Sequence, residues 1–244
     1  MVRRCLSSKV NNKQGTLCDL VKICGITTKA TLDAVADAKA SHVGFVSVAK
    51  SPRYLNMVDG QALAKQCPPA LSRVALLSNP ELSHIDEVVS NWSPDALQFH
   101  GDETPAFLQA VKARFPEIGL WKAIGIAGPS DLDDVQLFER HTDLILCDAK
   151  PPAKSDRGGG HGNVFDWSIL GGMTARVPWI LAGGLTPENV ANAIQQVGQY
   201  PGFTGVDVSS GVEGKPGQKD PALISDFIGS AKAAMAEMRA ASAG

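Results

Sequence analysis

The sequence lacks an excess of charge of either sign. Its 23 lysines and arginines are balanced by 25 aspartates and glutamates, which leaves a formal net charge of −2 at pH 7. Proteins that bind nucleic acid or anionic lipid through a broad surface usually carry a strong basic excess. We therefore expect no nucleic-acid partner and no membrane partner, and we expect any bound anion to be held by a local site.

Long apolar runs and clustered cysteines are also missing. No stretch approaches the roughly 18 apolar residues of a membrane span, and the basic start of the chain has no apolar signal segment. The cysteines are odd in number and form neither a C-x-x-C pair nor a cysteine–histidine cluster at zinc spacing. They are Cys5, Cys18, Cys24, Cys67 and Cys147. These absences predict reduced thiols, no bound metal and a cytoplasmic location.

Residues 1–18 contain no aspartate or glutamate but several basic residues and serines. We interpret them as a flexible N-terminal extension, with an organelle transit segment as the alternative. Residues 19–244 contain no low-complexity linker and no charge block that would divide them. We therefore expect these residues to form one domain.

Short β-branched or apolar runs alternate with longer segments of helical periodicity along this domain. The expected strands are Leu20–Cys24, Val43–Val48, Arg73–Leu77, Ala96–Phe99, Leu120–Ile124, Leu144–Cys147, Trp179–Leu181 and Gly205–Val208. The expected helices are Lys29–Lys39, Asp59–Cys67, His84–Asn91, Thr104–Phe115, Pro129–His141, Trp167–Gly171, Pro187–Val197 and Pro221–Met238. Eight strands, each followed by a helix, predict an α/β protein with a single (β/α)₈ barrel, the TIM barrel.

In such a barrel the working site lies at the C-terminal ends of the strands. Cys24 ends the first strand, and Asp148 follows three strongly apolar residues of the sixth. Taken alone, Cys24 is more typical of a small core residue than of a reactive thiol. Asp148 is followed by a glycine-rich loop, residues 150–165, and not by a helix that it would cap. We interpret Asp148 as a candidate general acid, and the loop as a segment that closes over a ligand.

Two other strand ends carry candidate binding residues. Arg53 follows the second strand and has the fork of donors that binds a carboxylate or phosphate, although a solvated loop arginine is an equal alternative. Gln98 and His100 alternate with Phe99, so both are expected to face the barrel interior. A structural histidine is the alternative for His100.

The ends of the seventh and eighth strands form the most specific local pattern. Gly183 and Gly184 follow one strand, and Ser209 and Ser210 follow the other. Bare backbone N–H groups, hydroxyls and short helix starts at these two ends are typical of the phosphate site of many barrels. Glycines that serve only tight turns explain one loop but not both. We therefore predict a phosphate-binding site here.

Residues 21 to 228 resemble the phosphoribosylanthranilate isomerases, enzymes of tryptophan biosynthesis. The motifs are Lys-Ile-Cys-Gly-Ile-Thr at 22–27, Ser-Pro-Arg-Tyr at 51–54, Leu-Gln-Phe-His-Gly-Asp-Glu at 97–103, Leu-Cys-Asp-Ala-Lys at 146–150, Gly-Gly-Gly-His-Gly at 158–162, Phe-Asp-Trp at 165–167, Ala-Gly-Gly-Leu-Thr-Pro-Glu-Asn-Val at 182–190 and Gly-Val-Asp-Val-Ser-Ser-Gly-Val-Glu at 205–213. Their order, at the ends of six strands, makes the resemblance specific.

The resemblance implies an Amadori rearrangement of a phosphoribosyl substrate without cofactor or metal. It assigns the general base to Cys24 and the general acid to Asp148. It also implies that Arg53 binds the anthranilate carboxylate and that Asp207 binds the ribosyl hydroxyls. Gln98 and His100 fall in a matched motif as substrate-binding candidates. The phosphate site implied by the family coincides with the one predicted above.

One segment departs from the family pattern, because Ser47, Val48 and Ala49 stand where the family usually has an aromatic pair. The packing of the anthranilate ring is therefore open.

Two other functions compete with the isomerase. A phosphosugar epimerase would show paired histidine and aspartate metal ligands, and a metabolite sensor would have no need of Cys24 and Asp148 together. The sequence is compatible with a monomer and with a homodimer.

Overall fold

The computed structural model describes residues 19–150, 166–174 and 176–242, and these form a closed barrel of eight parallel strands. The strands are β1 (Leu20–Cys24), β2 (His42–Val46), β3 (Ser72–Leu77), β4 (Ala96–Phe99), β5 (Gly119–Ile126), β6 (Leu144–Ala149), β7 (Trp179–Leu181) and β8 (Phe203–Val208). Strand β1 pairs with both β2 and β8, which closes the sheet. The predicted (β/α)₈ barrel is confirmed.

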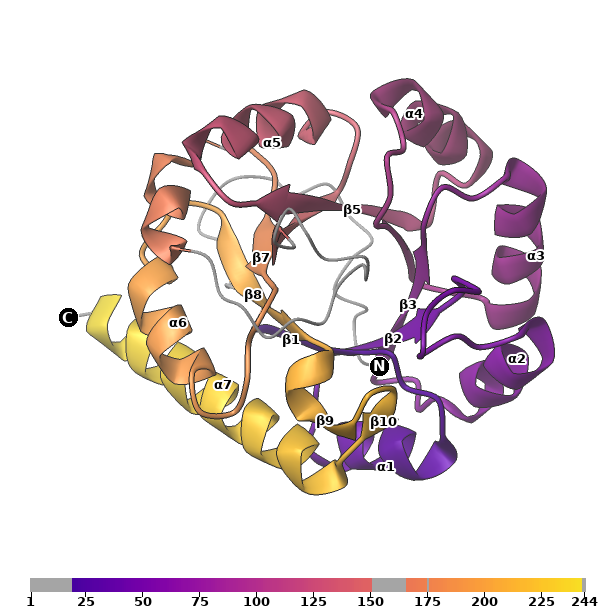
Figure 1. Ribbon diagram of the computed structural model, residues 1–244, viewed down its shortest axis with the longest axis horizontal. Helices are drawn as coiled ribbons and strands as arrows, with labels where there is room; N and C mark the ends of the chain where they lie inside the picture. The colour runs from indigo at the N-terminus through magenta and orange to yellow at the C-terminus, as the bar shows by residue number, and fades with distance from the viewer. Residues whose placement is uncertain (1–18, 151–165, 175, 243–244) are drawn as a thin grey trace.

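Helices surround the barrel, as Figure 1 shows. They are α1 (Lys29–Asp37), α2 (Met57–Gln66), α3 (Leu82–Trp92), α4 (Pro105–Arg114), α5 (Leu132–Phe138), α6 (Val190–Val197) and α7 (Pro221–Ser242), with 3₁₀ turns η1 (Pro129–Asp131), η2 (Trp167–Gly172) and η3 (Ser210–Val212). Polar side chains cap the start of several of them. Thr28 and Thr104 each accept a hydrogen bond from the backbone N–H three residues later.

The strand bounds of β1, β4 and β7 agree with the predicted ones, and most others shift by one or two residues. One of these shifts affects a candidate site residue: β6 was expected to end at Cys147 but extends to Ala149. It continues because Asp148 and Ala149 pair with Gly125 and Ile126 of the long strand β5. Asp148 therefore belongs to the strand itself, which fixes its backbone.

Two helix predictions were wrong in detail. The segment expected as one helix from Pro129 to His141 is divided into η1 and α5, because Asp131 accepts hydrogen bonds from the N–H groups of Ala127 and Gly128 and ties down the turn. Helix α6 begins at Val190 and not at Pro187. A two-stranded hairpin of β9 (Glu213–Lys215) and β10 (Gln218–Lys219) precedes α7 and was not predicted.

Apolar side chains pack in two places, as the alternation of strand residues requires. One cluster fills the space between sheet and helices, and a smaller one fills the barrel interior. The interior cluster consists of Leu20, Val74, Ala96, Trp121, Ala123, Leu144, Leu146, Ile180 and Ala182. The charged side chains of Lys22 and Asp207 are buried as well. The barrel is thus a packed core, with polar groups toward its C-terminal end.

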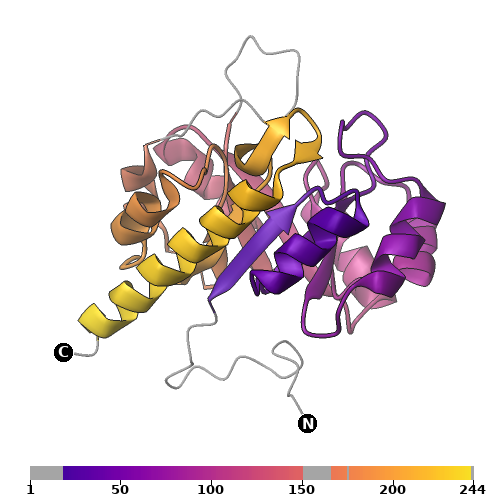
Figure 2. The same cartoon turned by 90° about the horizontal axis from the view of Figure 1, so that it is seen from below.

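None of the helices in the described ranges combines the length and the apolar composition of a membrane-spanning segment. The predicted N-terminal extension, residues 1–18, and most of the predicted glycine-rich loop, residues 151–165, lie outside the described residues. Figure 2 shows the β9–β10 hairpin beside the C-terminal end of β1, the end of the barrel where the sequence places the site.

Candidate active site

Cys24 is the last residue of β1, and only 4% of its surface is exposed. Gly44, its register partner on β2, leaves room for the thiol, because a Cβ there would lie 2.8 Å from Sγ. Burial raises the pKa of the Cys24 thiol above its ordinary value of 9.0, and the positive charges of Lys22 and Lys219 partly offset the rise. The thiol is therefore protonated at neutral pH in the ligand-free protein.

A buried ion pair lies one layer below the thiol. Lys22 Nζ donates to Asp207 Oδ1 at 2.8 Å, with the lysine side chain completely buried. Burial raises the pKa of Asp207, and Lys22 opposes that rise. Asp207, a residue implicated by the family resemblance, is therefore paired with Lys22, which the sequence did not single out. Its position two residues before Cys24, on the same face of the strand, was the available signal.

Asp148 and His100 come together from β6 and from the end of β4. His100 Nε2 lies 3.1 Å from Asp148 Oδ2, and the two side chains are 39% and 21% exposed. The loop after His100 is held by Glu103, which accepts the N–H of Gly101 at 3.0 Å and pairs with the buried Lys122. This buried pair fixes the backbone of the loop that follows His100.

Gln98 lies two residues before His100 and is fully buried in the barrel. Neither its Oε1 nor its Nε2 has a hydrogen-bond partner among the residues that the structure describes. An unpaired buried amide is costly, typically about 1–3 kcal/mol. Gln98 thus keeps both a donor and an acceptor unused inside the barrel.

The predicted phosphate residues lie between the two predicted catalytic residues. The wall from β6 to β1 runs through β7 and β8. Gly183 and Gly184 have φ angles of 79° and 66°, which favour glycine. A Cβ on Gly183 would lie 2.6 Å from Asp148 Oδ1. Ser209 Oγ donates to the carbonyl oxygen of Cys24 at 3.1 Å. The two loops therefore lie against Asp148 on one side and against the backbone of Cys24 on the other.

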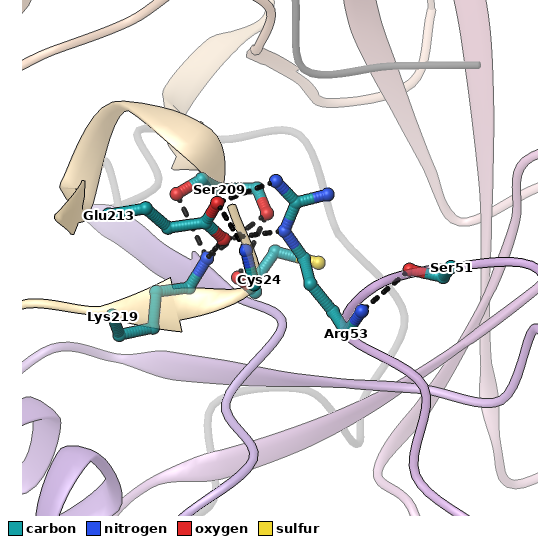
Figure 3. Close-up of polar contacts among 7 residues, drawn as sticks. Cys24, Ser51, Arg53, Ser209, Glu213 and Lys219 are labelled. Atoms are coloured by element: carbon teal, nitrogen blue, oxygen red, sulfur yellow. Dashed lines mark hydrogen bonds and ion pairs between the residues drawn. The ribbon is translucent and has the colours of Figure 1, made fainter. Parts of the chain in front are cut away.

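Arg53 forms an ion pair with Glu213, a residue that the sequence did not indicate as part of the site. Its Nε and Nη2 donate to Glu213 Oε1 and Oε2 at 2.6 and 2.9 Å. Lys219 Nζ also donates to Glu213 Oε1, at 2.6 Å. Figure 3 shows these side chains gathered beside Cys24 and Ser209. Glu213 closes the last matched motif, which was the signal available in the sequence.

The segment that departs from the family pattern is tied to the neighbouring helix. Ser47 is buried, and its hydroxyl lies 2.9 Å from Nε2 of His84 in α3.

Nowhere in the described part of the chain do three or more histidine, cysteine, aspartate or glutamate side chains gather in a group that could hold a metal ion.

Comparison with known proteins gives the family. Residues 21–230 match the family described as N-(5'-phosphoribosyl)anthranilate (PRA) isomerase. The N-(5'-phosphoribosyl)anthranilate isomerase of Paracoccus denitrificans is 46% identical over 213 residues, which cover 87% of this chain and 97% of the relative. The chain belongs to the phosphoribosylanthranilate isomerase family. The family resemblance and the enzyme class, an isomerase, are confirmed.

Solved structures of phosphoribosylanthranilate isomerases share the fold. One, in complex with reduced 1-(o-carboxyphenylamino)-1-deoxyribulose 5-phosphate, is 34% identical with a TM-score of 0.75 and covers 88% of this chain and 99% of that one. Another, of monomers derived from the dimeric enzyme of Thermotoga maritima, is 33% identical with a TM-score of 0.73 and covers 88% and 98%.

Proposed function

We propose that this protein converts N-(5-phosphoribosyl)anthranilate to 1-(2-carboxyphenylamino)-1-deoxyribulose 5-phosphate in tryptophan biosynthesis. The proposal rests on one arrangement in a chain of this family. A thiol ends β1, a carboxyl group lies one residue before the end of β6, and a glycine-bearing loop and a serine-bearing loop lie between them. An Amadori rearrangement of a phosphorylated sugar requires an acid, a base and a phosphate site, and this arrangement supports all three assignments.

Asp148 serves as the general acid in the first step. It transfers a proton to the furanose ring oxygen while the bond from that oxygen to C1 breaks, and the anthranilate nitrogen forms a double bond to C1. The product is an open-chain Schiff base. His100 Nε2 lies 3.1 Å from Asp148 Oδ2, and this contact supports the assignment because it places a second proton-carrying group beside the carboxyl group.

Cys24 serves as the general base in the second step. Its thiolate removes the proton from C2, the electrons of that bond move toward the nitrogen, and the resulting enolamine tautomerises to the aminoketose. Because burial raises the pKa of the thiol, the base form depends on the lysines that lower it, Lys22 and Lys219. No external electron carrier is needed, because the substrate and product are isomers.

Substrate binding is divided among the remaining site residues. Arg53 binds the anthranilate carboxylate, and Asp207 binds the ribosyl hydroxyls. Gln98 binds a polar group of the substrate, which its unpaired buried amide supports. His100 lines the same pocket beside the acid. The phosphate is held by the loops after β7 and β8, through residues Gly183, Gly184, Ser209 and Ser210.

The first prediction tests this assignment with purified protein. Phosphoribosylanthranilate is generated in place from anthranilate and phosphoribosyl pyrophosphate, and turnover is followed as loss of anthranilate-type fluorescence. Because general acid or base groups contribute roughly 10²–10⁴ in rate, Cys24→Ser and Asp148→Asn should each lower kcat by at least about a hundredfold. Near-normal turnover in either variant contradicts the assignment.

Two control variants make the same chemical changes elsewhere. Cys67→Ser alters a half-buried free thiol, and Asp86→Asn alters an exposed carboxylate that pairs with Arg114. Both should retain the wild-type rate. If the controls lose as much turnover as Cys24→Ser and Asp148→Asn, the losses reflect a destabilised barrel and not the removal of catalytic groups.

The competing functions give different results in the same assay. A metal-dependent epimerase would lose activity on chelation, whereas the proposed isomerase should keep its rate in excess chelator. A metabolite sensor would bind the phosphorylated compound without any loss of fluorescence above background.

We further propose a cytoplasmic location, which the free thiols of Cys24, Cys67 and Cys147 support. The assembly is a monomer or a homodimer, which sedimentation distinguishes.

A further inference from the structure

The loop after β8 folds back onto the loop after β2. The β9–β10 hairpin begins with Glu213, and its turn contains Gly217, whose φ is 78°. A Cβ on Gly217 would lie 2.6 Å from the carbonyl oxygen of Pro52. On the other side of the arginine, a Cβ on Gly25 would lie 2.4 Å from Arg53 Cδ. Arg53 is thus confined between the end of β1 and the hairpin.

Glu213 occupies one edge of the Arg53 guanidinium group. The group is planar and carries five N–H donors in a fixed fork. Nε and one N–H of Nη2 are directed to the two oxygens of Glu213. In the part of the chain that the structure describes, Nη1 has no hydrogen-bond partner. The opposite edge, formed by Nη1 and the second N–H of Nη2, is therefore the edge available to a ligand carboxylate.

A second cation balances the charge of Glu213. Lys219 Nζ contacts Glu213 Oε1 and also donates to the carbonyl oxygen of Ser209 at 2.9 Å. The side chains of Glu213, Lys219 and Arg53 are 4%, 0% and 13% exposed. Two cations around one carboxylate leave a net positive charge in a nearly water-free region. An anionic ligand group at Arg53 completes the balance.

We propose that Glu213 is a positioning residue for Arg53. It fixes the guanidinium plane so that the edge bearing Nη1 receives the aryl carboxylate of the substrate. This inference rests on the proposed function, because that function supplies the carboxylate. Burial of the pair makes the orientation rigid, and a shared hydrogen-bond network through Lys219 and Ser209 joins this anchor to the backbone of Cys24 (Figure 3). The substrate carboxylate and the base are thereby held by one network.

The test separates positioning from general stability by comparing two ligands. One is reduced 1-(o-carboxyphenylamino)-1-deoxyribulose 5-phosphate, the compound bound in a related structure. The other is the same compound without its carboxyl group. Dissociation constants are measured by calorimetry for the wild type, Glu213→Gln and Arg53→Ala. Because a charged hydrogen bond contributes about 1.5–3 kcal/mol, Glu213→Gln should weaken binding of the carboxylate compound by about tenfold or more.

The compound without the carboxyl group provides the decisive comparison. Its affinity should change by less than about twofold in Glu213→Gln, because it makes no bond to Arg53. In the Arg53→Ala background, Glu213→Gln should have little further effect on either ligand. Equal weakening of both ligands, or no weakening of either, would overturn the positioning role. Asp86→Asn, which breaks a bidentate pair with Arg114 far from the site, is the matched control and should leave both affinities unchanged.

Two further measurements keep the outcome unambiguous. If circular dichroism shows that Glu213→Gln does not fold, Glu213→Asp is measured in the same ligand comparison, where its shorter side chain should give the same selective loss. Turnover of phosphoribosylanthranilate by the wild type is measured in parallel. Absent turnover contradicts the proposed function, whereas normal turnover with unselective ligand losses contradicts only the role of Glu213.

Discussion

At the scale of single residues, burial of Cys24 opposes its proposed role as a base, and two nearby lysines partly offset this effect. A buried thiol resists ionisation, because the thiolate loses its hydration. Lys22 and Lys219 supply positive charge that lowers the pKa from the value that burial alone would give. The same two lysines also hold Asp207 and Glu213 in ion pairs, so under the proposed function they act both on the thiol and on residues that bind or orient the substrate.

The second prediction concerns the ionisation of this thiol. The pKa of Cys24 lies above 9.0, so the thiolate fraction should rise with pH and the inflection of its alkylation by iodoacetamide should lie above pH 9. In Lys219→Met the inflection should move to still higher pH, because a positive charge is lost. Alkylation is followed by mass spectrometry of the peptide that contains Cys24. An inflection below pH 8 contradicts the prediction.

At the scale of elements, the loop from β7 to α6 is shaped by a side chain from its own end. Asn189 Oδ1 accepts the N–H of Thr186 at 2.8 Å, and its Nδ2 donates to the carbonyl oxygen of Gly184 at 2.9 Å. These two bonds hold residues 186–189 as a turn and explain why α6 starts three residues later than the Thr-Pro pair predicts. The second bond also holds Gly184, one of the two glycines of the proposed phosphate site.

The third prediction follows from these two bonds. Asn189→Ala should lower the free energy of unfolding by about 1–2 kcal/mol and raise the KM for phosphoribosylanthranilate several-fold, with kcat less affected. Urea unfolding and initial rates measure the two effects. Asn189→Asp retains the acceptor for Thr186 and should be closer to the wild type in stability. A fall in stability with an unchanged KM would show that the loop does not position the phosphate site.

At the scale of the whole molecule, closure of the barrel buries a histidine near its N-terminal end. His42 packs against Trp121 at a ring-centroid distance of 5.2 Å, and its Nε2 has no hydrogen-bond partner among the described residues. Burial, together with the charge of Lys22, lowers the pKa of His42 from 6.5 to about 4. The folded barrel therefore holds this imidazole neutral in mildly acidic solution, in which an unfolded chain would protonate it.

The fourth prediction is a loss of stability in acid through His42. Between pH 6.5 and about 4 the unfolded state binds the proton and the folded state does not, so this group's contribution to stability falls as the pH falls. The loss should reach about 2–3 kcal/mol at pH 4.5. Urea unfolding at pH 7.5 and 4.5 should show it in the wild type and in His141→Gln. The pH difference should be smaller by that amount in His42→Phe, and an unchanged difference would contradict it.

The sequence alone determined the barrel and the strand ends that carry the site. Hydrophobic alternation and helical periodicity are local patterns, and eight repeats of strand and helix permit few other architectures. The chain-order motifs then identified the family and directed attention to Cys24 and Asp148. The same local patterns could not give the hairpin before α7, because β9 and β10 are too short and too polar to be recognised as strands.

Only the tertiary structure decided which charges meet. Lys22 and Asp207 are 185 residues apart, and Arg53 and Glu213 are 160 apart. Each pair forms because closure of the sheet places β1 between β2 and β8, which brings residues from the two ends of the domain together. A sequence pattern records which face of its own strand a residue occupies, but not its partner across the barrel. That partner depends on closure and register, and these are properties of the whole fold.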